Sequence, residues 1–281
     1  MNAQNVELLE KQDHMSGMQH LEMTITSLTQ PYASIARLRG KIETDQIELW
    51  STANLAVRID VEQAVNSRPT SRIYTIRSFD KLNQEVEIDL VRHPSPSPAM
   101  RWLNTVKVGE KVTLTGPRVH INPNFGTAKT CFIFADDTGI PAVYAILNQW
   151  PEHVQAEIFL DTHEAEILNE LPVIETVNYH LINQIEFKQN TQNQGLFEQL
   201  KQIEPVDEMT VWAACERQQA RLIREFCLQK FKMAKDDVRV FGYWKAGVSS
   251  SIIDEARLEH YSKLLQQGHG LTEFDDLDVK V

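Results

Sequence analysis

An arginine and a tyrosine two residues apart could bind one ligand that carries both an anion and an aromatic ring. Residues 71–77 read Ser-Arg-Ile-Tyr-Thr-Ile-Arg. In a β-strand Arg72 and Tyr74 share one face, so a guanidinium and a ring would meet such a ligand side by side. A dinucleotide has both features. Thr75 points to the other face, yet its hydroxyl or amide could reach a ring edge where the strand twists. The same residues are also typical of an ordinary surface strand around a packed tyrosine.

A second candidate site is the glycine-containing turn that follows the apolar run at 130–135. Residues 135–141 read Ala-Asp-Asp-Thr-Gly-Ile-Pro. In open α/β sheets ligands bind beyond the carboxyl ends of the strands, and a turn that opens a helix offers free backbone amides to phosphate. Thr138 and Gly139 are therefore candidate ligand contacts. The segment is not a GxGxxG fingerprint, and an ordinary helix N-cap has the same residue types.

The cysteines and histidines do not predict a metal site. Cys131, Cys215 and Cys227 are too few and too far apart for a thiolate cage, and their odd number argues against a disulfide framework. The nine histidines show no HxH, HxxxH or HExxH spacing. A reduced, cytoplasmic protein fits this usage best. Cys215 could be an exposed thiol at a strand end or a small buried filler, and we assign it no role.

Composition excludes several classes of protein. The chain has 281 residues, 42% of them hydrophobic, a length that suggests one large or two medium domains with a buried core. Its net charge of −11 disfavours nucleic acid and anionic membrane surfaces as partners. The first 22 residues lack the apolar core of a signal peptide, and no later run has the ~20 apolar residues of a membrane span. We expect a soluble protein without membrane insertion.

The hydropathy pattern divides the chain into two parts. Between about residues 20 and 120 apolar residues alternate, as in 85–91, which predicts a strand that pairs with 71–77 in a hairpin. Further strands are expected at 46–50, 56–61 and 111–115, which together favour a small antiparallel barrel or sandwich.

Beyond about residue 127 short apolar strands alternate with helical stretches. We expect helices at 142–150 and after Cys215, and five strands at 130–135, 156–160, 178–182, 209–214 and 238–241. This pattern predicts an open, mainly parallel α/β sheet. The predicted divisions are a flexible N-terminus over 1–20, a β-barrel domain over 21–126 and an α/β domain over 127–281. The α/β domain includes a C-terminal helix and an acidic tail at 273–278, whose end we expect to be poorly ordered.

Five sequence blocks, in order, resemble those of the siderophore-interacting protein family. The first, Arg72–Arg77, is similar to the family's Arg-x-Tyr-Thr-x-Arg flavin motif. The second is His93 followed by Pro98-Ala99-Met100-Arg101-Trp102, with Gly116-Pro117-Arg118 closing it, and it resembles the family's pyrophosphate loop. The others are Ala135–Ala142, Trp212–Glu216 and Gly242–Gly247. Ordered blocks over roughly residues 20 to 260 make coincidence improbable.

The resemblance implies a ferredoxin-NADP reductase-like fold, with an FAD-binding barrel before an NAD(P)H-binding type of α/β domain. It implies an FAD-dependent ferric-siderophore reductase that releases iron in the cytoplasm by reducing chelated Fe(III) to Fe(II), with NADH, NADPH or ferredoxin as electron donor. Electron transfer through the flavin needs no side chain as a general base, so no catalytic residue is implied, and no resident metal is implied. The implied cofactor contacts are Arg72, Tyr74, Thr75, Arg77, His93, Ala99, Met100, Trp102, Asp136, Thr138, Gly139 and Trp244.

The chain departs from the family pattern at several positions. Ser97 and Met100 stand where the family has Gly and Ser, which predicts a lost hydroxyl contact and a modest FAD affinity. An acidic protein needs a local basic rim to hold an anionic ferric chelate. Arg58, Arg118 and Lys245 are the candidates for that rim, and each could equally be a solvated surface cation.

The electron donor and the acceptor both have alternatives. Residues 161–166 place three carboxylates and no Arg or Lys after the second strand of the α/β domain, which favours NADH over NADPH. The same acids could simply start a helix, with ferredoxin as donor. Two other functions stay open: a flavin reductase of another acceptor, and a non-catalytic siderophore-binding module. The sequence specifies neither the siderophore nor the oligomeric state.

Overall fold

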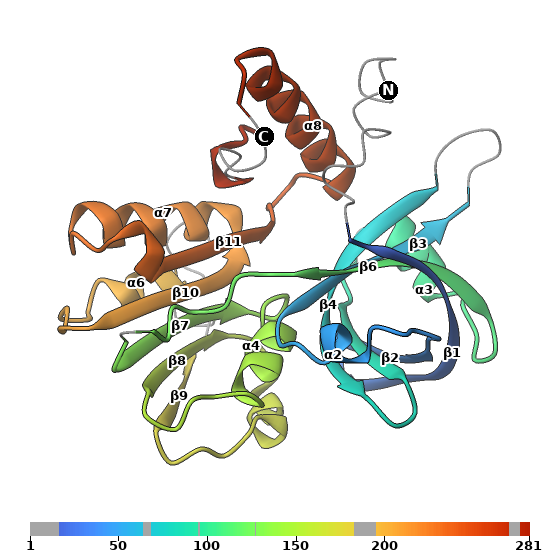
Figure 1. Ribbon diagram of the computed structural model, residues 1–281, viewed down its shortest axis with the longest axis horizontal. Helices are drawn as coiled ribbons and strands as arrows, with labels where there is room; N and C mark the ends of the chain where they lie inside the picture. Colours follow the sequence, from blue (N-terminus) through green and yellow to red (C-terminus); the bar gives the residue numbers. More distant parts are fainter. Residues whose placement is uncertain (1–16, 64–68, 95, 127, 183–194, 270–275) are drawn as a thin grey trace.

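The computed structural model describes residues 17–63, 69–94, 96–126, 128–182, 195–269 and 276–281. Figure 1 shows two bodies side by side, a β-barrel formed by the first half of the chain and an α/β layer formed by the second. This arrangement confirms the predicted fold class.

Six antiparallel strands close the barrel in the order β1-β2-β5-β4-β3-β6. They are β1 Gln19–Tyr32, β2 Ile35–Lys41, β3 Leu55–Glu62, β4 Thr70–Asp80, β5 Glu85–Val91 and β6 Lys111–Val119. Alternation explains the core: Val86, Ile88 and Leu90 of β5 are fully buried in the barrel. The expected hairpin of β4 with β5 is confirmed. A short helix, α3 Pro98–Leu103, also packs on the barrel.

The strand expected at 46–50 is wrong, because Ile47–Trp50 forms a short helix, α2. Two side-chain contacts stabilise the turn. The indole nitrogen of buried Trp50 donates to Oε1 of Gln19 at 2.9 Å, and the Ser51 hydroxyl donates to the Ile47 carbonyl at 2.7 Å. Local hydropathy cannot distinguish a short apolar strand from a helical turn.

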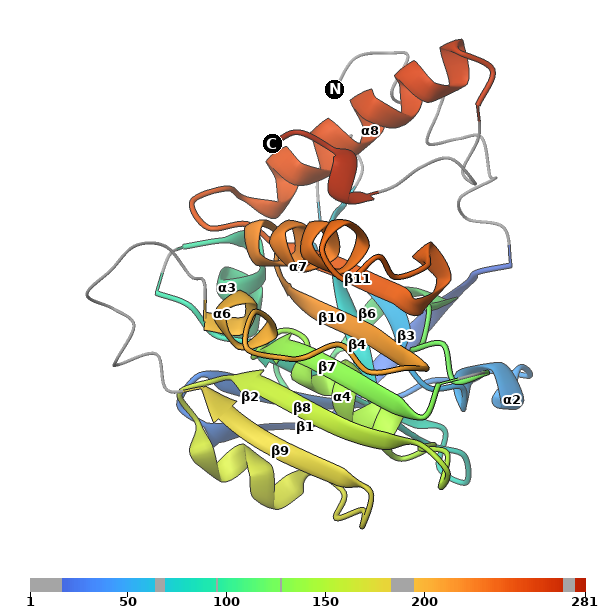
Figure 2. The ribbon, with the colours of Figure 1, turned by 90° about the vertical axis from the view of Figure 1, so that its left-hand side faces the viewer.

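The second body is a five-stranded parallel sheet with the strand order β11-β10-β7-β8-β9. Its strands are β7 Thr130–Asp136, β8 Gln155–Asp161, β9 Val177–Ile182, β10 Met209–Glu216 and β11 Val238–Trp244, which confirms all five predicted strands. Helices α6 Gly195–Leu200 and α7 Arg217–Gln229 cover one face, as Figure 2 shows. Helix α4 Ile140–Leu147 and the 3₁₀ turn η2 Ala165–Glu170 cover the other.

A cluster of buried charges joins the barrel to the α/β body. Arg77 of β4 contacts Glu87 at 3.1 Å, Asp89 at 3.2 Å and Glu170 of η2 at 2.6 Å. Arg37 of β2 contacts Asp89 at 2.6 Å and Glu170 at 2.7 Å. The Arg77 guanidinium also lies 3.6 Å from the centre of the Tyr144 ring on α4. We call these five charged residues the interdomain ion cluster.

Beyond β11 the chain forms what we call the C-terminal unit, helix α8 Ser250–Gln266 and the segment Asp276–Val281, which begins with the 3₁₀ turn η5 Asp276–Asp278. Figures 1 and 2 show α8 at one end of the molecule, joined by a connecting segment to the end of β11, while η5 packs against α7. No described helix combines the length and apolar character needed to cross a bilayer.

The predicted divisions agree only in part with the elements. The boundary at 126/127 falls between the last barrel strand and the first strand of the sheet. Gln19 and His20, expected in the flexible N-terminus, belong to β1. Of the tail expected to be poorly ordered, residues 273–275 lie outside the described residues, whereas residues 276–278 form a turn held by arginine side chains.

Candidate functional site

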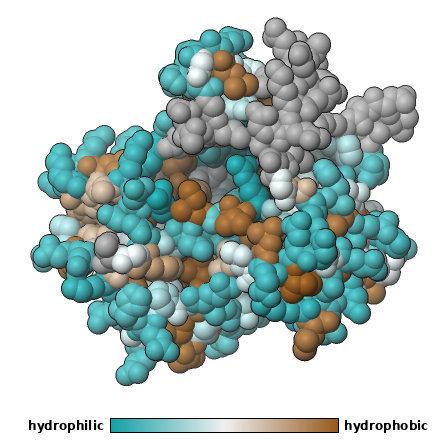
Figure 3. All heavy atoms as spheres, in the orientation of Figure 1, coloured by the Kyte–Doolittle hydropathy of each residue, from teal (hydrophilic) through white to brown (hydrophobic). Residues whose placement is uncertain are grey.

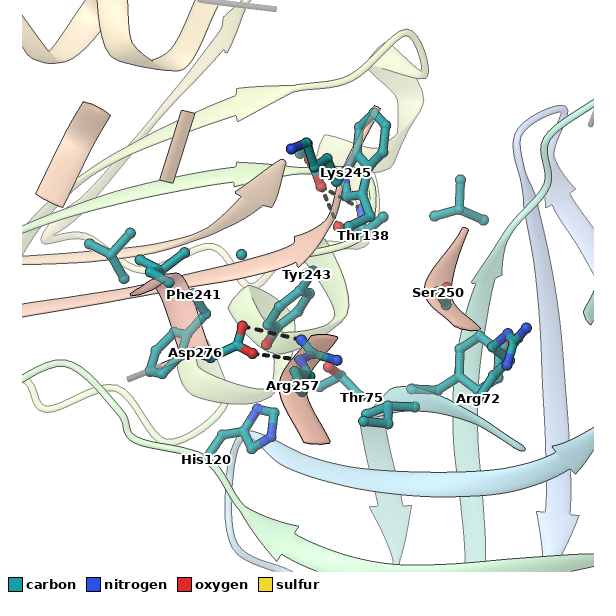
Figure 4. A pocket seen from close by; sticks show the side chains of 18 of the residues that line it. Arg72, Thr75, His120, Thr138, Phe241, Tyr243, Lys245, Ser250, Arg257 and Asp276 are labelled. Atoms are coloured by element: carbon teal, nitrogen blue, oxygen red, sulfur yellow. Dashed lines mark hydrogen bonds and ion pairs between the residues drawn. The ribbon is translucent and has the colours of Figure 1, made fainter. Parts of the chain in front are cut away.

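A large cavity of about 1900 Å³ lies between the barrel, the carboxyl edge of the sheet and the C-terminal unit. Figure 3 shows a hollow between the two bodies with apolar side chains along its rim, and Figure 4 shows side chains converging on it from both bodies and from α8. Pockets for a single small molecule are typically ~300–1,000 Å³. The cavity therefore has room for more than one ligand.

Strand β4 contributes Arg72, Tyr74 and Thr75 to the cavity, so the structure brings together the three residues of the first candidate site. The Arg72 guanidinium donates to the Ser71 carbonyl at 2.8 Å and to the Ser251 hydroxyl of α8 at 3.0 Å. Burial raises the pKa of Tyr74 to about 12, which keeps the ring neutral. A neutral ring beside a guanidinium can hold an aromatic ligand with an attached anion.

The segment after β5 contributes His93, and the first turn of α3 contributes Ala99 and Met100 to the same cavity. Ser97, which departs from the family pattern, caps α3 by accepting from the Met100 amide at 3.2 Å. Trp102 instead packs against the barrel core.

Of the predicted cofactor contacts, Arg77 is the one whose observed position differs most from the prediction. Its side chain is 5% exposed and belongs to the interdomain ion cluster instead of the cavity wall. Arg77 lies five residues from Arg72, an odd spacing that directs the two side chains to opposite faces of β4. Its three carboxylate partners leave the guanidinium little capacity for a ligand.

Asp136 at the end of β7 organises the edge of the sheet. Its carboxylate accepts four hydrogen bonds, from the Thr138 amide at 2.9 Å, the Thr138 hydroxyl at 2.5 Å, the Glu216 amide at 2.9 Å and the Trp244 indole at 2.7 Å. Burial raises the pKa of Asp136, and these four donors oppose that shift. Asp136 thus connects three parallel strands, and it positions Thr138 and Trp244 at the cavity.

Gly139 is required by a close backbone contact. A Cβ atom at this position would lie 2.2 Å from the Ala214 carbonyl oxygen of β10. Any larger residue would push the turn away from the sheet, and Thr138 with it. The role that the structure gives Gly139 is therefore to let the turn approach β10.

The three candidate substrate cations all line the cavity. Arg58 of β3 donates to the Ser71 hydroxyl at 3.2 Å. Lys245 follows β11 and donates to the Val281 carbonyl of the C-terminal unit. Arg118 lies on β6, where it pairs with Ala56 of β3, two residues before Arg58. The structure thus brings together positive side chains from three separate segments.

Sequence reasoning missed many cavity residues, among them His120, Phe241, Tyr243, Arg257 and Asp276. Tyr243 lies inside the motif block Gly242–Gly247, of which only Trp244 and Lys245 were predicted to contact a ligand. The contribution of Arg257 depends on how α8 packs, for which the sequence carries no local signal. The His120 ring stacks on Phe241, with centroids 6.1 Å apart and an interplanar angle of 18°.

His120 gives the site a testable pH dependence. Burial, with the nearby charges of Arg118 and Arg257, lowers the pKa of His120 to about 4. Between that value and the ordinary 6.5, the unfolded chain takes up a proton that the folded chain does not. Stability therefore falls as the pH drops, by roughly 2 kcal/mol from pH 7 to 5 for this group.

Urea unfolding of the parent protein and of His120→Gln, each at pH 7 and at pH 5, measures this effect. The quantity compared is the free energy of unfolding that each protein loses between the two pH values. We expect the loss in the parent to exceed the loss in His120→Gln by roughly 2 kcal/mol. Because burial raises the pKa of Asp137 to about 6, an opposite contribution is present in both proteins and cancels in the comparison. An identical pH dependence in the two proteins would contradict a buried neutral imidazole.

Cys215 is a buried residue at the end of β10. Burial raises the pKa of its thiol well above the usual value. A thiol that stays protonated and inaccessible is a small core filler, in agreement with the second of the two interpretations considered for it.

Comparisons with known proteins identify the family. Residues 41–121 match the model of the siderophore-interacting FAD-binding domain, and residues 128–247 match that of the siderophore-interacting protein. The ferric acinetobactin reductase of Acinetobacter baumannii is 46% identical over 276 residues, which cover 97% of this chain and 95% of the relative. A ferric vibriobactin reductase of Vibrio cholerae is 23% identical over 68% of this chain and 70% of the relative.

Solved structures agree with this assignment. A siderophore-interacting protein from Acinetobacter baumannii superposes with a TM-score of 0.85 at 45% identity, covering 90% of this chain and all of that one. A ferredoxin reductase of a carbazole 1,9a-dioxygenase has a TM-score of 0.58 at 13% identity, covering 81% and 70%, and shows the shared fold alone. The chain belongs to the siderophore-interacting protein family.

Proposed function

We propose that this protein is an FAD-dependent reductase that releases iron from ferric siderophores in the cytoplasm by converting chelated Fe(III) to Fe(II). The observation that carries the proposal is the convergence of Arg72, Tyr74 and Thr75 with the Thr138 turn and several cations on one cavity. The names of the relatives, reductases of ferric acinetobactin and ferric vibriobactin, support the same reaction class.

The residues around β4 fit FAD. Among the described residues, the hydrogen bonds of Arg72 go to neutral oxygens, so its charge is available to a pyrophosphate. Tyr74 offers a neutral ring for stacking on the isoalloxazine, and Thr75 lies beside it for the ring edge. His93, Ala99 and Met100 would complete this wall of the cofactor site. FAD, when bound, supplies the transfer of single electrons to iron.

The protein contributes binding and orientation. The Thr138 turn, held by Asp136, would face the reductant from the sheet edge. Arg58, Arg118 and Lys245 would hold an anionic ferric chelate, with iron entering as substrate. No proton needs to be abstracted from a carbon atom, so the site requires no general base.

We propose NADH as the electron donor. Asp161, at the carboxyl end of β8, lines the cavity and could accept a hydrogen bond from a ribose hydroxyl. The neighbouring Glu164 and Glu166 add negative charge that disfavours a ribose 2′-phosphate. Anaerobic stopped-flow reduction of the bound flavin tests this: NADH is expected to bleach it faster than NADPH. Faster bleaching by NADPH would contradict the charge argument, and bleaching by reduced ferredoxin alone would assign a protein donor.

The reductase itself is tested by electron delivery to iron. Protein purified with FAD would be reduced anaerobically, mixed with a ferric siderophore and assayed with a chromogenic Fe(II) chelator, with flavin-free protein as the control. We expect flavin reoxidation and Fe(II) formation in proportion. A reduced flavin that the ferric siderophore does not reoxidise would indicate a flavin reductase of another acceptor. A protein that binds the siderophore and no flavin would be a non-catalytic module.

The cationic wall predicts a salt-dependent KM. Arg118→Glu reverses a charge that faces the chelate, so KM for an anionic ferric siderophore is expected to rise roughly tenfold at low ionic strength. The bound flavin content should not change. Lys129→Glu is the matched control, because Lys129 is a solvent-exposed cation paired with Glu208 away from the cavity. Equal KM values for the two variants would show that Arg118 is only a surface cation.

A further inference from the structure

Four arginines converge on the segment Asp276–Val281. Arg217, Arg221 and Arg224 have i, i+4, i+7 spacing and so share one face of α7. Arg257 of α8 joins them, beyond residue 247 where the family match ends. In a chain with a net charge of −11, this is a concentrated positive patch.

The chain places its own carboxylate in this patch. Arg217 Nη1 contacts Asp276 Oδ2 at 2.6 Å, while Arg257 Nε and Nη2 contact Asp276 Oδ1 and Oδ2 at 2.5 and 3.1 Å. Figure 4 shows the paired bonds from Arg257 to Asp276 inside the cavity. One carboxylate thus lies between two guanidinium groups, the arrangement that bidentate anion recognition requires.

The following residues of the tail supply further acceptors. Arg221 donates to the Leu277 carbonyl at 2.8 Å and to the Val279 carbonyl at 2.6 Å. Arg224 contacts the Asp278 carboxylate at 2.7 Å. Each arginine of the patch therefore has an oxygen of the segment Asp276–Val281 as a partner.

The patch needs an anion. Arg217 is 1% exposed, and within the described part of the chain its Nε atom has no hydrogen-bond partner. A buried guanidinium without a counter-charge is strongly destabilising. Burial disfavours the ionised Asp276, yet Arg257 and Arg217 outweigh it and hold the pKa of that carboxyl below its usual range. Asp276 therefore stays ionised at neutral pH and fulfils this need.

We propose that Arg217, Arg221, Arg224 and Arg257 form a binding site for a phosphate-bearing ligand, and that the segment Asp276–Val281 is its resident competitor. Phosphate, like carboxylate, presents planar pairs of oxygens to a guanidinium, with a larger charge. The ligand gains access when the tail leaves.

Burial of two tail side chains helps to set how strongly the tail competes. The side chains of Leu277 and Val279 are buried, so a departing tail exposes them to water. Only molecules whose tail is undocked can bind a phosphate ligand, so the apparent affinity equals the intrinsic affinity multiplied by the undocked fraction. Asp276, Asp278 and Arg257 also line the cavity that contains Arg72, so tail departure enlarges the space beside the proposed flavin site.

Calorimetric titration with inorganic pyrophosphate at constant ionic strength tests the proposal. Asp276→Asn removes the competing charge at nearly constant volume, and we expect it to bind pyrophosphate at least about tenfold more tightly than the parent, equivalent to ~1.4 kcal/mol. Asp236→Asn is the matched control, because Asp236 lines the same cavity but pairs with Arg239. It should bind as the parent does. Adding Arg257→Gln to Asp276→Asn should abolish the gain.

The flavin site is controlled separately. Arg72→Gln should leave the gain from Asp276→Asn intact, so the result stands whether or not the protein uses FAD. Titration with ADP distinguishes the source: tighter binding than pyrophosphate assigns a nucleotide, and equal binding assigns the inorganic anion. Equal affinities of Asp276→Asn and Asp236→Asn, or a gain that survives Arg257→Gln, would overturn the proposal.

A measurement on the unaltered protein guards against a variant that fails to fold. Pyrophosphate should increase hydrogen exchange at the amides of residues 276–281, including the Val279 amide that donates to the Asp276 carbonyl. Sodium chloride at the same ionic strength should have a smaller effect. Unchanged exchange up to the solubility limit of pyrophosphate would show that the tail is a permanent structural element.

Discussion

Replacing Arg77 with alanine is expected to lower the free energy of unfolding by about 3–5 kcal/mol, the typical cost of removing one partner from a buried ion pair. The guanidinium contacts Glu87, Asp89 and Glu170, and the first two carboxylates are almost fully buried. Without Arg77 the three carboxylates would repel one another, and Arg37 would be the main positive charge left to compensate them. Urea unfolding monitored by tryptophan fluorescence measures the loss.

Arg39→Ala is the matched control. Arg39 also contacts Glu87, at 2.7 Å, but its side chain is 53% exposed. Exposed ion pairs contribute about 0–1 kcal/mol because water screens them. If Arg77→Ala and Arg39→Ala lost equal free energies of unfolding, the buried ion pairs of Arg77 would be no more stabilising than the exposed ion pair of Arg39. Arg77→Lys is also expected to be destabilising, because one ammonium cannot bridge three carboxylates with the guanidinium's geometry.

Tyr74→Ala is expected to weaken FAD binding by about 2 kcal/mol, or roughly 30-fold in Kd. The reason is the loss of a neutral aromatic surface on the cavity wall next to Arg72. Titrating flavin-free protein with FAD and following flavin fluorescence measures Kd directly.

Tyr74→Phe separates the ring from the hydroxyl. It keeps the stacking surface, so its Kd should stay within a few-fold of the parent's. If alanine leaves the affinity unchanged, the ring does not contact the flavin. If Tyr74→Phe loses as much FAD affinity as Tyr74→Ala, the hydroxyl and not the ring makes the important contact.

The sequence predicted the fold well because the relevant signals are local. Apolar and polar residues alternate in β5, and β7 and β10 are continuous apolar runs. Each pattern identifies a strand without knowledge of its neighbours. The hairpin of β4 and β5 follows from a short polar connection. The failure at Ile47–Trp50 has the opposite cause, because the contact of Trp50 with Gln19 joins residues 31 positions apart.

The candidate site was predictable only where strand geometry sufficed. Arg72 and Tyr74 reach the cavity together because they are two residues apart on β4. Arg77 belongs to the same motif, yet its partner Glu170 is 93 positions away in another body. Arg257 and Asp276 contribute through the packing of α8 and the return of the chain. Such contacts depend on how whole elements pack, which no local pattern encodes.

The four hydrogen bonds to Asp136 bear on the thermodynamics of ligand association. Thr138, Glu216 and Trp244 are held at the edge of the sheet by the protein itself. Ordering a loop during binding costs conformational entropy, on the order of 1 kcal/mol per residue or more. Here the turn is ordered during folding, so this entropy is not lost again when a ligand binds. A ligand that docks against this edge contacts a preorganised surface. Its binding should therefore carry a small conformational-entropy loss, with little backbone rearrangement of the turn.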